Sequence, residues 1–150
     1  LKQRVEESQI PETGMFSGNV LVAEDIETSQ KLMQSSLSRM GLEVSIAKDG
    51  HQALKKASSG PFDVILMDMQ MPHVNGYDVT RTLRRQDINT PIVALTARAM
   101  QEDDQKCLKA GCDGYLAKPV NRRELLQVLA KYLPHRQDIS NKDKQPSACS

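Results

Sequence analysis

Short apolar runs alternate along this chain with longer segments in which apolar residues recur every three or four positions. The short runs predict five β-strands, over residues 20–23, 44–47, 64–67, 92–95 and 115–117. The longer segments predict five helices, over residues 27–40, 52–59, 77–85, 101–110 and 122–133. Gly41 and Gly111 follow two of these segments, as is common where helices end.

Strict alternation of strands and helices is typical of a parallel sheet with helices on both faces. The predicted strands are almost continuously apolar, which fits burial on both sides. Sheets of this kind bind ligands beyond the carboxyl ends of their strands. The polar flanks divide the chain into an N-terminal extension or linker (1–17), one folded domain (18–134) and a flexible C-terminal tail (135–150).

Side chains able to carry chemistry gather at that edge of the predicted sheet. Asp68 ends the third strand, Glu24 and Asp25 follow the first, Thr96 ends the fourth, and Lys118 follows the fifth. Three neighbouring carboxylates repel one another, so we expect a cation among them. Their oxygen ligands suit Mg²⁺ or Mn²⁺ rather than Zn²⁺. The Lys ammonium and the Thr hydroxyl suit the oxygens of a phosphoryl group.

Any one of these residues could simply cap a helix or bridge a neighbour, but all of them lie at one edge. With the motifs around them, the chain resembles the receiver domain of response regulators, the CheY-like phosphoacceptor module of two-component signalling. The matching motifs are Leu-Val-Ala-Glu-Asp at 21–25, Asp-Met-Gln-Met-Pro at 68–72, Asn-Gly at 75–76, Leu-Thr-Ala at 95–97, Ala-Gly-Cys-Asp-Gly-Tyr at 110–115 and Lys-Pro at 118–119. The resemblance implies a flavodoxin-like (βα)5 fold over 18–134, a doubly wound five-stranded parallel sheet with strand order 2-1-3-4-5.

The resemblance also implies roles for the clustered residues. Asp68 would accept a phosphoryl group from a phosphohistidine, and Lys118 and Thr96 would contact the oxygens of that group. Glu24, Asp25, Asp68 and the backbone carbonyl of Gln70 would bind Mg²⁺, with Mn²⁺ as the alternative ion.

A conformational switch is implied as well. In the family, inward movement of the Thr at position 96 lets the aromatic residue at position 115, here Tyr115, turn from solvent into the fold. The Lys118–Pro119 peptide bond is expected to be cis, which would aim the Lys into the site. Arg98 and Gln70 occupy the variable positions that tune the lifetime of the acyl phosphate.

The implied partner is a histidine kinase or a histidine phosphotransfer domain. The Asp-Met-Gln-Met-Pro form and the Glu-Asp pair are most like receivers of hybrid sensor histidine kinases, whose whole chain can be an enzyme. This module itself would perform at most self-phosphotransfer and autodephosphorylation. Partner docking is expected on the first helix through Gln30, Lys31, Gln34 and Leu37, and a homodimer through the fourth to fifth helices is a further option.

Composition excludes several classes of function. The net charge is +1 and the chain has no Trp, so neither a basic stripe nor a stacking platform for nucleic acid is present. No apolar run is long enough to span a bilayer, so we expect no membrane contact by this segment. Three cysteines without metal-ligand spacing fit a reducing, cytoplasmic location, although the parent protein could be membrane-anchored.

Two alternative functions have less support in the sequence. A phosphatase of the haloacid dehalogenase type needs a second Asp two residues after the nucleophile, where this chain has Gln70, which cannot transfer protons. A receiver-like interaction module that is never phosphorylated usually lacks the acid pair, the acceptor or the Lys, all of which this chain retains.

Overall fold

The computed structural model describes residues 16–71, 74–97 and 101–133. Strands and helices alternate through these ranges, as the sequence predicts, with bounds within about two residues of the predicted ones. The strands are β1 (Gly18–Ala23), β2 (Leu42–Ala47), β3 (Val64–Asp68), β4 (Ile92–Thr96) and β5 (Gly114–Ala117). The helices are α2 (Glu27–Arg39), α3 (Gly50–Ser59), α4 (Gly76–Arg85), α5 (Gln101–Ala110) and α6 (Arg122–Tyr132).

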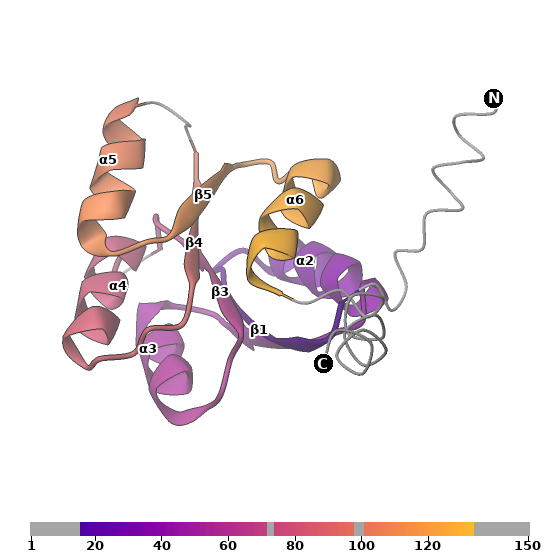
Figure 1. Ribbon diagram of the computed structural model, residues 1–150, viewed down its shortest axis with the longest axis horizontal. Coiled ribbons are helices and arrows are strands. Elements are labelled where there is room, and N and C mark those ends of the chain that lie inside the picture. The colour runs from indigo at the N-terminus through magenta and orange to yellow at the C-terminus, as the bar shows by residue number, and fades with distance from the viewer. Residues whose placement is uncertain (1–15, 72–73, 98–100, 134–150) are drawn as a thin grey trace, which may run out of the picture.

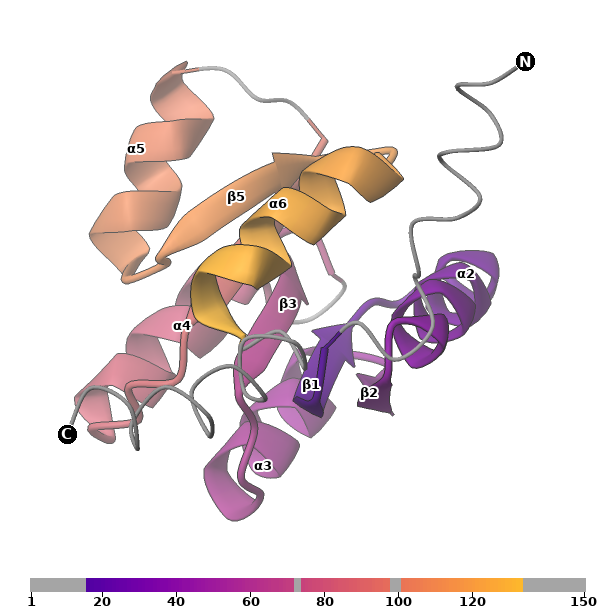
Figure 2. The ribbon, with the colours of Figure 1, turned by 45° about the vertical axis from the view of Figure 1, so that its right-hand side comes forward.

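All strand pairs are parallel, and the order across the sheet is β2-β1-β3-β4-β5 (Figure 2). The predicted flavodoxin-like topology is therefore confirmed. Register brings the carboxyl ends of the strands together, with Ala23 opposite Met67 and Thr96 opposite Ala117. The loops that follow β1, β3 and β5 consequently open on one edge of the sheet.

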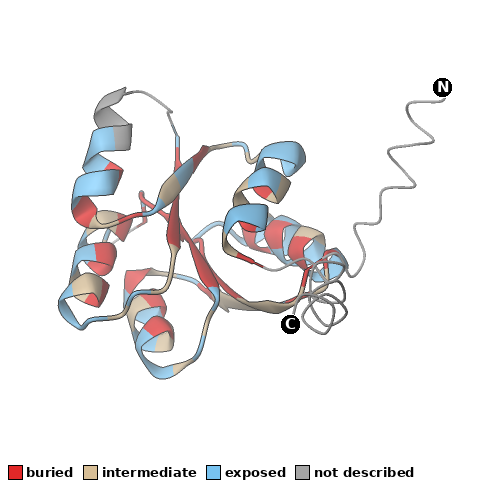
Figure 3. Cartoon of the chain, viewed as in Figure 1, coloured by how far each residue is buried: buried red, intermediate tan, exposed pale blue. Residues whose placement is uncertain are grey.

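Successive side chains along each strand pack alternately into two separate hydrophobic cores. Val20 and Val22 of β1 face the core under α2 and α6, whereas Leu21 and Ala23 face the core under α3, α4 and α5. Figure 1 shows the two helical layers on opposite sides of the sheet, and Figure 3 shows the central strands β3 and β4 buried between them. This double cover explains why the strands read as nearly continuous apolar runs.

Local capping explains where two helices begin. The Asp49 carboxylate accepts a hydrogen bond from the Gln52 N–H at 2.8 Å, so α3 starts at Gly50, two residues earlier than predicted. The Asn75 side chain accepts from the Asp78 N–H at 2.9 Å and starts α4 in the same way. Short polar caps carry little periodicity, which is why pattern alone places such boundaries loosely.

Phe16 lies inside the stretch interpreted from sequence as a linker, yet its side chain is fully buried against α2 and β2. Its N–H donates to the Met40 carbonyl at 2.7 Å. Two residues on, Gly18 has φ +142°, and a Cβ there would lie 3.4 Å from Leu133. The first and last described segments therefore meet at the amino edge of the sheet. The tail expected over 135–150 and residues 1–15 of the expected extension lie outside the described residues.

Candidate functional site

Three carboxylates converge at the carboxyl edge of the sheet. Glu24 and Asp25 leave β1, Asp68 ends β3, and one oxygen of each lies within 4.8 Å of the others. The Glu24 N–H donates to the Ala47 carbonyl of β2 at 2.9 Å, which extends the parallel ladder to the acid pair. Glu24 and Asp68 are buried and Asp25 is exposed. An all-oxygen donor set with one open side fits a hard divalent cation such as Mg²⁺.

Lys118 places a positive charge inside this acidic cluster. Its ammonium donates to Glu24 Oε1 at 3.0 Å and to Asp68 Oδ2 at 3.1 Å. The Lys118 N–H donates to the Thr96 carbonyl at 2.7 Å, which continues the β4–β5 pairing and fixes where the side chain starts. The Lys118–Pro119 bond is cis, as predicted.

Asp68 has a donor on each carboxylate oxygen. The Gln70 N–H donates to Oδ1 at 2.9 Å, and Lys118 occupies Oδ2. Behind it, the loop to α4 passes so closely that a Cβ on Gly76 would lie 2.5 Å from the Asp68 carbonyl oxygen. The Asn-Gly motif therefore has a local reason, because Asn75 caps the helix and Gly76 permits the close approach.

Burial and charge act against each other at the two ends of the Lys118–Glu24 pair. Burial raises the pKa of Glu24, and the hydrogen bond from Lys118 offsets only part of that effect. Burial alone would lower the pKa of Lys118, but the hydrogen bonds and charges of Glu24 and Asp68 outweigh it, so the Lys118 pKa is raised. The ammonium is thus held charged beside the Glu24 carboxylate, whose burial makes ionisation costly without a cation.

An opening of about 460 Å³ gives access to the cluster. Its lining residues are Asp25, Ile26, Ser29, Asp68, Gln70, Ala97, Lys118 and Pro119. Thr96 is buried at the end of β4 beside this opening and does not line it. Arg98 lies outside the described residues.

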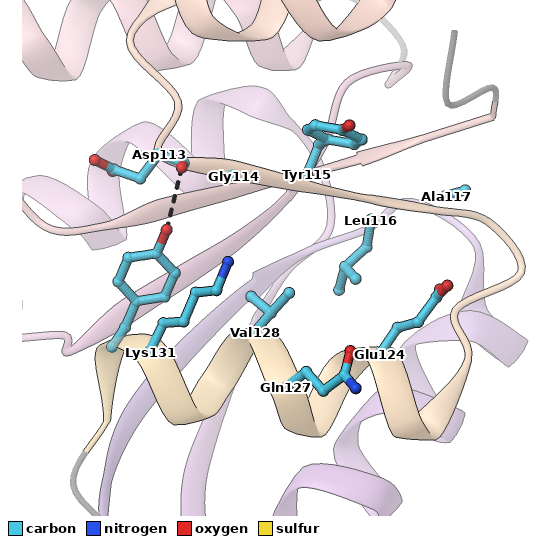
Figure 4. A pocket seen from close by; sticks show the side chains of 10 residues that line it. Asp113, Gly114, Tyr115, Leu116, Ala117, Glu124, Gln127, Val128 and Lys131 are labelled. Carbon is cyan, nitrogen blue, oxygen red and sulfur yellow. Dashed lines mark hydrogen bonds between the residues drawn. The ribbon is translucent and has the colours of Figure 1, made fainter.

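Tyr115 lies away from the acidic cluster, on β5. It is 39% exposed. Figure 4 shows Tyr115 and Leu116 on opposite sides of β5, with Leu116 directed toward α6. At the start of this strand, the Tyr132 hydroxyl donates to the Asp113 carbonyl at 3.1 Å.

The predicted docking face on the first helix is partly wrong. Lys31 and Gln34 of α2 are exposed, but Gln30 and Leu37 are buried. Gln30 shares the inward face with Met33 and Leu37, and its amide donates to the Glu24 carbonyl at 2.7 Å. The spacing 30, 33, 37 is a helical period that could have revealed this.

Comparisons with known proteins identify the family of this chain. Residues 20–130 match the family model described as response regulator receiver domain. The chain is 41% identical over 130 residues to hybrid signal transduction histidine kinase I of Dictyostelium discoideum, covering 81% of this chain and 8% of that protein. Across the most similar curated relatives, the chain spans 4% to 12% of their length.

Two solved structures are also similar. One is the receiver domain of a sensor histidine kinase from Pseudomonas aeruginosa PAO1, with a magnesium ion in its active site cleft (39% identity, TM-score 0.72, 77% of this chain and 97% of that one). The other is the receiver domain of a Saccharomyces cerevisiae response regulator in complex with a histidine phosphotransfer protein (30% identity, TM-score 0.75, 79% and 90%). The fold, the motifs and the family match together show that this chain belongs to the response regulator receiver domain family, the receivers of two-component systems.

Proposed function

We propose that Asp68 is the phosphoacceptor of this receiver domain. The observation that carries the proposal is the Lys118 ammonium, which bridges Asp68 and Glu24 inside a cluster of carboxylates beside an open cleft. A lysine in that position can pair with a phosphoryl oxygen as soon as one is delivered to Asp68.

The reaction is a nucleophilic transfer. A carboxylate oxygen of Asp68 attacks phosphorus of a phosphohistidine, the P–N bond breaks as the P–O bond forms, and the imidazole leaves with a proton from solvent. Lys118 stabilises negative charge on the transferred group, and the Gln70 N–H keeps the Asp68 carboxylate oriented. Thr96 is proposed to donate its hydroxyl to a second phosphoryl oxygen.

Glu24, Asp25, Asp68 and the Gln70 carbonyl would hold Mg²⁺, with Mn²⁺ as the alternative ion. When bound, the ion supplies charge neutralisation for the phosphoryl oxygens. The proposed ion position stays open to solvent, because the Asp25 side chain is exposed and lines the cleft.

The partner is proposed to be a histidine kinase or a histidine phosphotransfer protein that docks beside the cleft. A groove of about 280 Å³ between α2 and α6 adjoins Glu24 and Lys118 and has mostly apolar walls. Leu32 on its rim is 69% exposed, although it is apolar. This groove takes the place of the buried Gln30 and Leu37 in the docking face predicted from sequence.

The proposal extends to the switch and to assembly. Thr96 and Tyr115 would change together after phosphorylation, altering the face formed by α5, β5 and α6. Leu108 and Tyr115 expose apolar surface there, at 56% and 39%, and β5 is an edge strand, so a homodimer would use this face.

The whole chain is proposed to be a cytoplasmic part of a hybrid sensor histidine kinase, in line with its relatives. No helix in the described ranges has the length and apolar character that a bilayer span requires.

The test is incubation with acetyl phosphate and Mg²⁺, followed by intact mass. We expect one added phosphoryl group in the wild type, none in Asp68→Asn, and none after EDTA treatment. Asp87→Asn is the matched control, because Asp87 is exposed and its φ of 63° suits Asn equally. An unmodified wild type that also fails to bind beryllofluoride would favour an interaction module that is never phosphorylated.

A further inference from the structure

A buried amide on the first helix contacts the backbone of the acid pair. Gln30 is 9% exposed, and its side-chain Nε2 donates to the Glu24 carbonyl oxygen at 2.7 Å. We infer that Gln30 is a positioning residue for the cation site, because it fixes the peptide group that joins Glu24 to Asp25. The inference rests on the proposed Mg²⁺ site and names a residue that acts on it from outside the ligand set.

The donor is itself held in place. The Gln30 N–H donates to the Ile26 carbonyl at 2.9 Å, within the first turn of α2, and the side chain lies on the buried face with Met33 and Leu37. Burying a side-chain amide is costly unless it is hydrogen-bonded. The Gln30 side chain is therefore held in the conformation that makes its bond to the Glu24 carbonyl.

The bond from Gln30 completes the immobilisation of residue 24. The Glu24 N–H donates to Ala47, and its carboxylate accepts from Lys118 at 3.0 Å and from the Ile26 N–H at 3.2 Å. The carbonyl of Glu24 belongs to the same peptide plane as the Asp25 N–H. Gln30 therefore sets the orientation of that plane.

Asp25 depends on this plane more than the other two acids do. Glu24 and Asp68 are buried and each is paired with Lys118, whereas the Asp25 side chain is exposed. The direction of an exposed carboxylate follows from the backbone that carries it. Without the Gln30 bond, the peptide could rotate and Asp25 would sample orientations that point away from Glu24 and Asp68, weakening the site by loss of preorganisation.

The test measures Mg²⁺ affinity by amide chemical-shift titration of the wild type, Gln30→Met and Gln34→Met. Methionine keeps the length and the helix propensity of glutamine but has no donor. Gln34 lies one turn further along α2 and is exposed, so it controls for the same substitution on the same helix. If Gln30→Met does not fold, Gln30→Ala removes the same donor with less bulk.

We expect the Mg²⁺ dissociation constant of Gln30→Met to rise about three- to tenfold, the range allowed by the net free energy of one hydrogen bond. Gln34→Met should stay within about twofold of the wild type. At saturating Mg²⁺, the phosphorylation rates of all three should agree. A dissociation constant equal to that of the wild type in the Gln30 variants, even with lowered stability, would reduce Gln30 to a helix anchor and overturn the inference. A wild type that binds no Mg²⁺ would overturn the proposed site itself, and the role of Gln30 with it.

Discussion

The Lys118 ammonium donates to the Glu24 carboxylate at 3.0 Å, although the two residues are 94 positions apart in the chain. Lys118 thus acts as a resident cation for the acidic cluster. Any divalent ion that enters must share the carboxylates with it, so under the proposed function the lysine would compete with the ion and also contact the phosphoryl group.

Replacing Lys118 by Met should separate these two effects. Mg²⁺ should bind several-fold more tightly, because a competing positive charge is gone. Phosphorylation by acetyl phosphate should slow by about 100-fold, as is typical when one preorganised donor is removed. Chemical-shift titration and time-resolved intact mass measure the two quantities. Lys131→Met should change neither, because Lys131 is an exposed residue of α6 that lines a separate pocket beside β5 (Figure 4). Weaker Mg²⁺ binding in Lys118→Met would contradict this account.

A substitution on the rim of the α2–α6 groove should affect only the protein partner. Leu32→Glu should slow transfer from a phosphorylated histidine phosphotransfer protein by about tenfold or more, because it places a charge on an apolar contact. Its reaction with acetyl phosphate should stay unchanged. Leu108→Glu is the matched control, since Leu108 is also an exposed helical leucine but belongs to α5. If both variants slow transfer equally, the groove is not the docking site.

Phe16→Ala should destabilise the domain by about 3–5 kcal/mol, because a fully buried phenylalanine leaves a large cavity. Urea denaturation gives the free energy of unfolding. Phe62, the other phenylalanine of the chain, is only partly buried, so Phe62→Ala should cost clearly less. Equal losses would mean that Phe16 does not belong to the core.

Alkaline pH should destabilise the fold through the buried thiol of Cys112. Burial raises the pKa of this thiol from 9.0 to about 12. Since the folded-state pKa is above the unfolded one, the contribution to stability is complete below pH 9. It is then lost toward pH 12, at about 1.4 kcal/mol per pH unit. Between about pH 8 and about pH 10.5, in the presence of a reductant, the wild type should lose about 2 kcal/mol more than Cys112→Ala. Parallel losses in the two proteins would refute this.

The sequence predicts the features that depend on hydrophobic periodicity and on which residues end the strands. β3 and β4 stand out because they are apolar runs covered on both faces, and the strand-end acids and Lys118 follow from a parallel sheet. The burial of Gln30 and Phe16 is not predicted from the sequence, for the opposite reason. A polar residue on a helix is usually solvated, so the residue type of Gln30 outweighs its helical spacing from Met33 and Leu37. Phe16 lies among polar neighbours and belongs to no period, so only its tertiary contacts decide its burial.

Gly18 and Leu133 adjoin one another at the amino edge of the sheet, and the acidic cleft opens at the carboxyl edge. Both ends of the described domain therefore lie at one edge of the sheet, and the cleft lies at the other. Because these two points of attachment lie opposite the cleft, neither end of the described domain leaves the fold beside Asp68, which suits a unit that is joined to other domains.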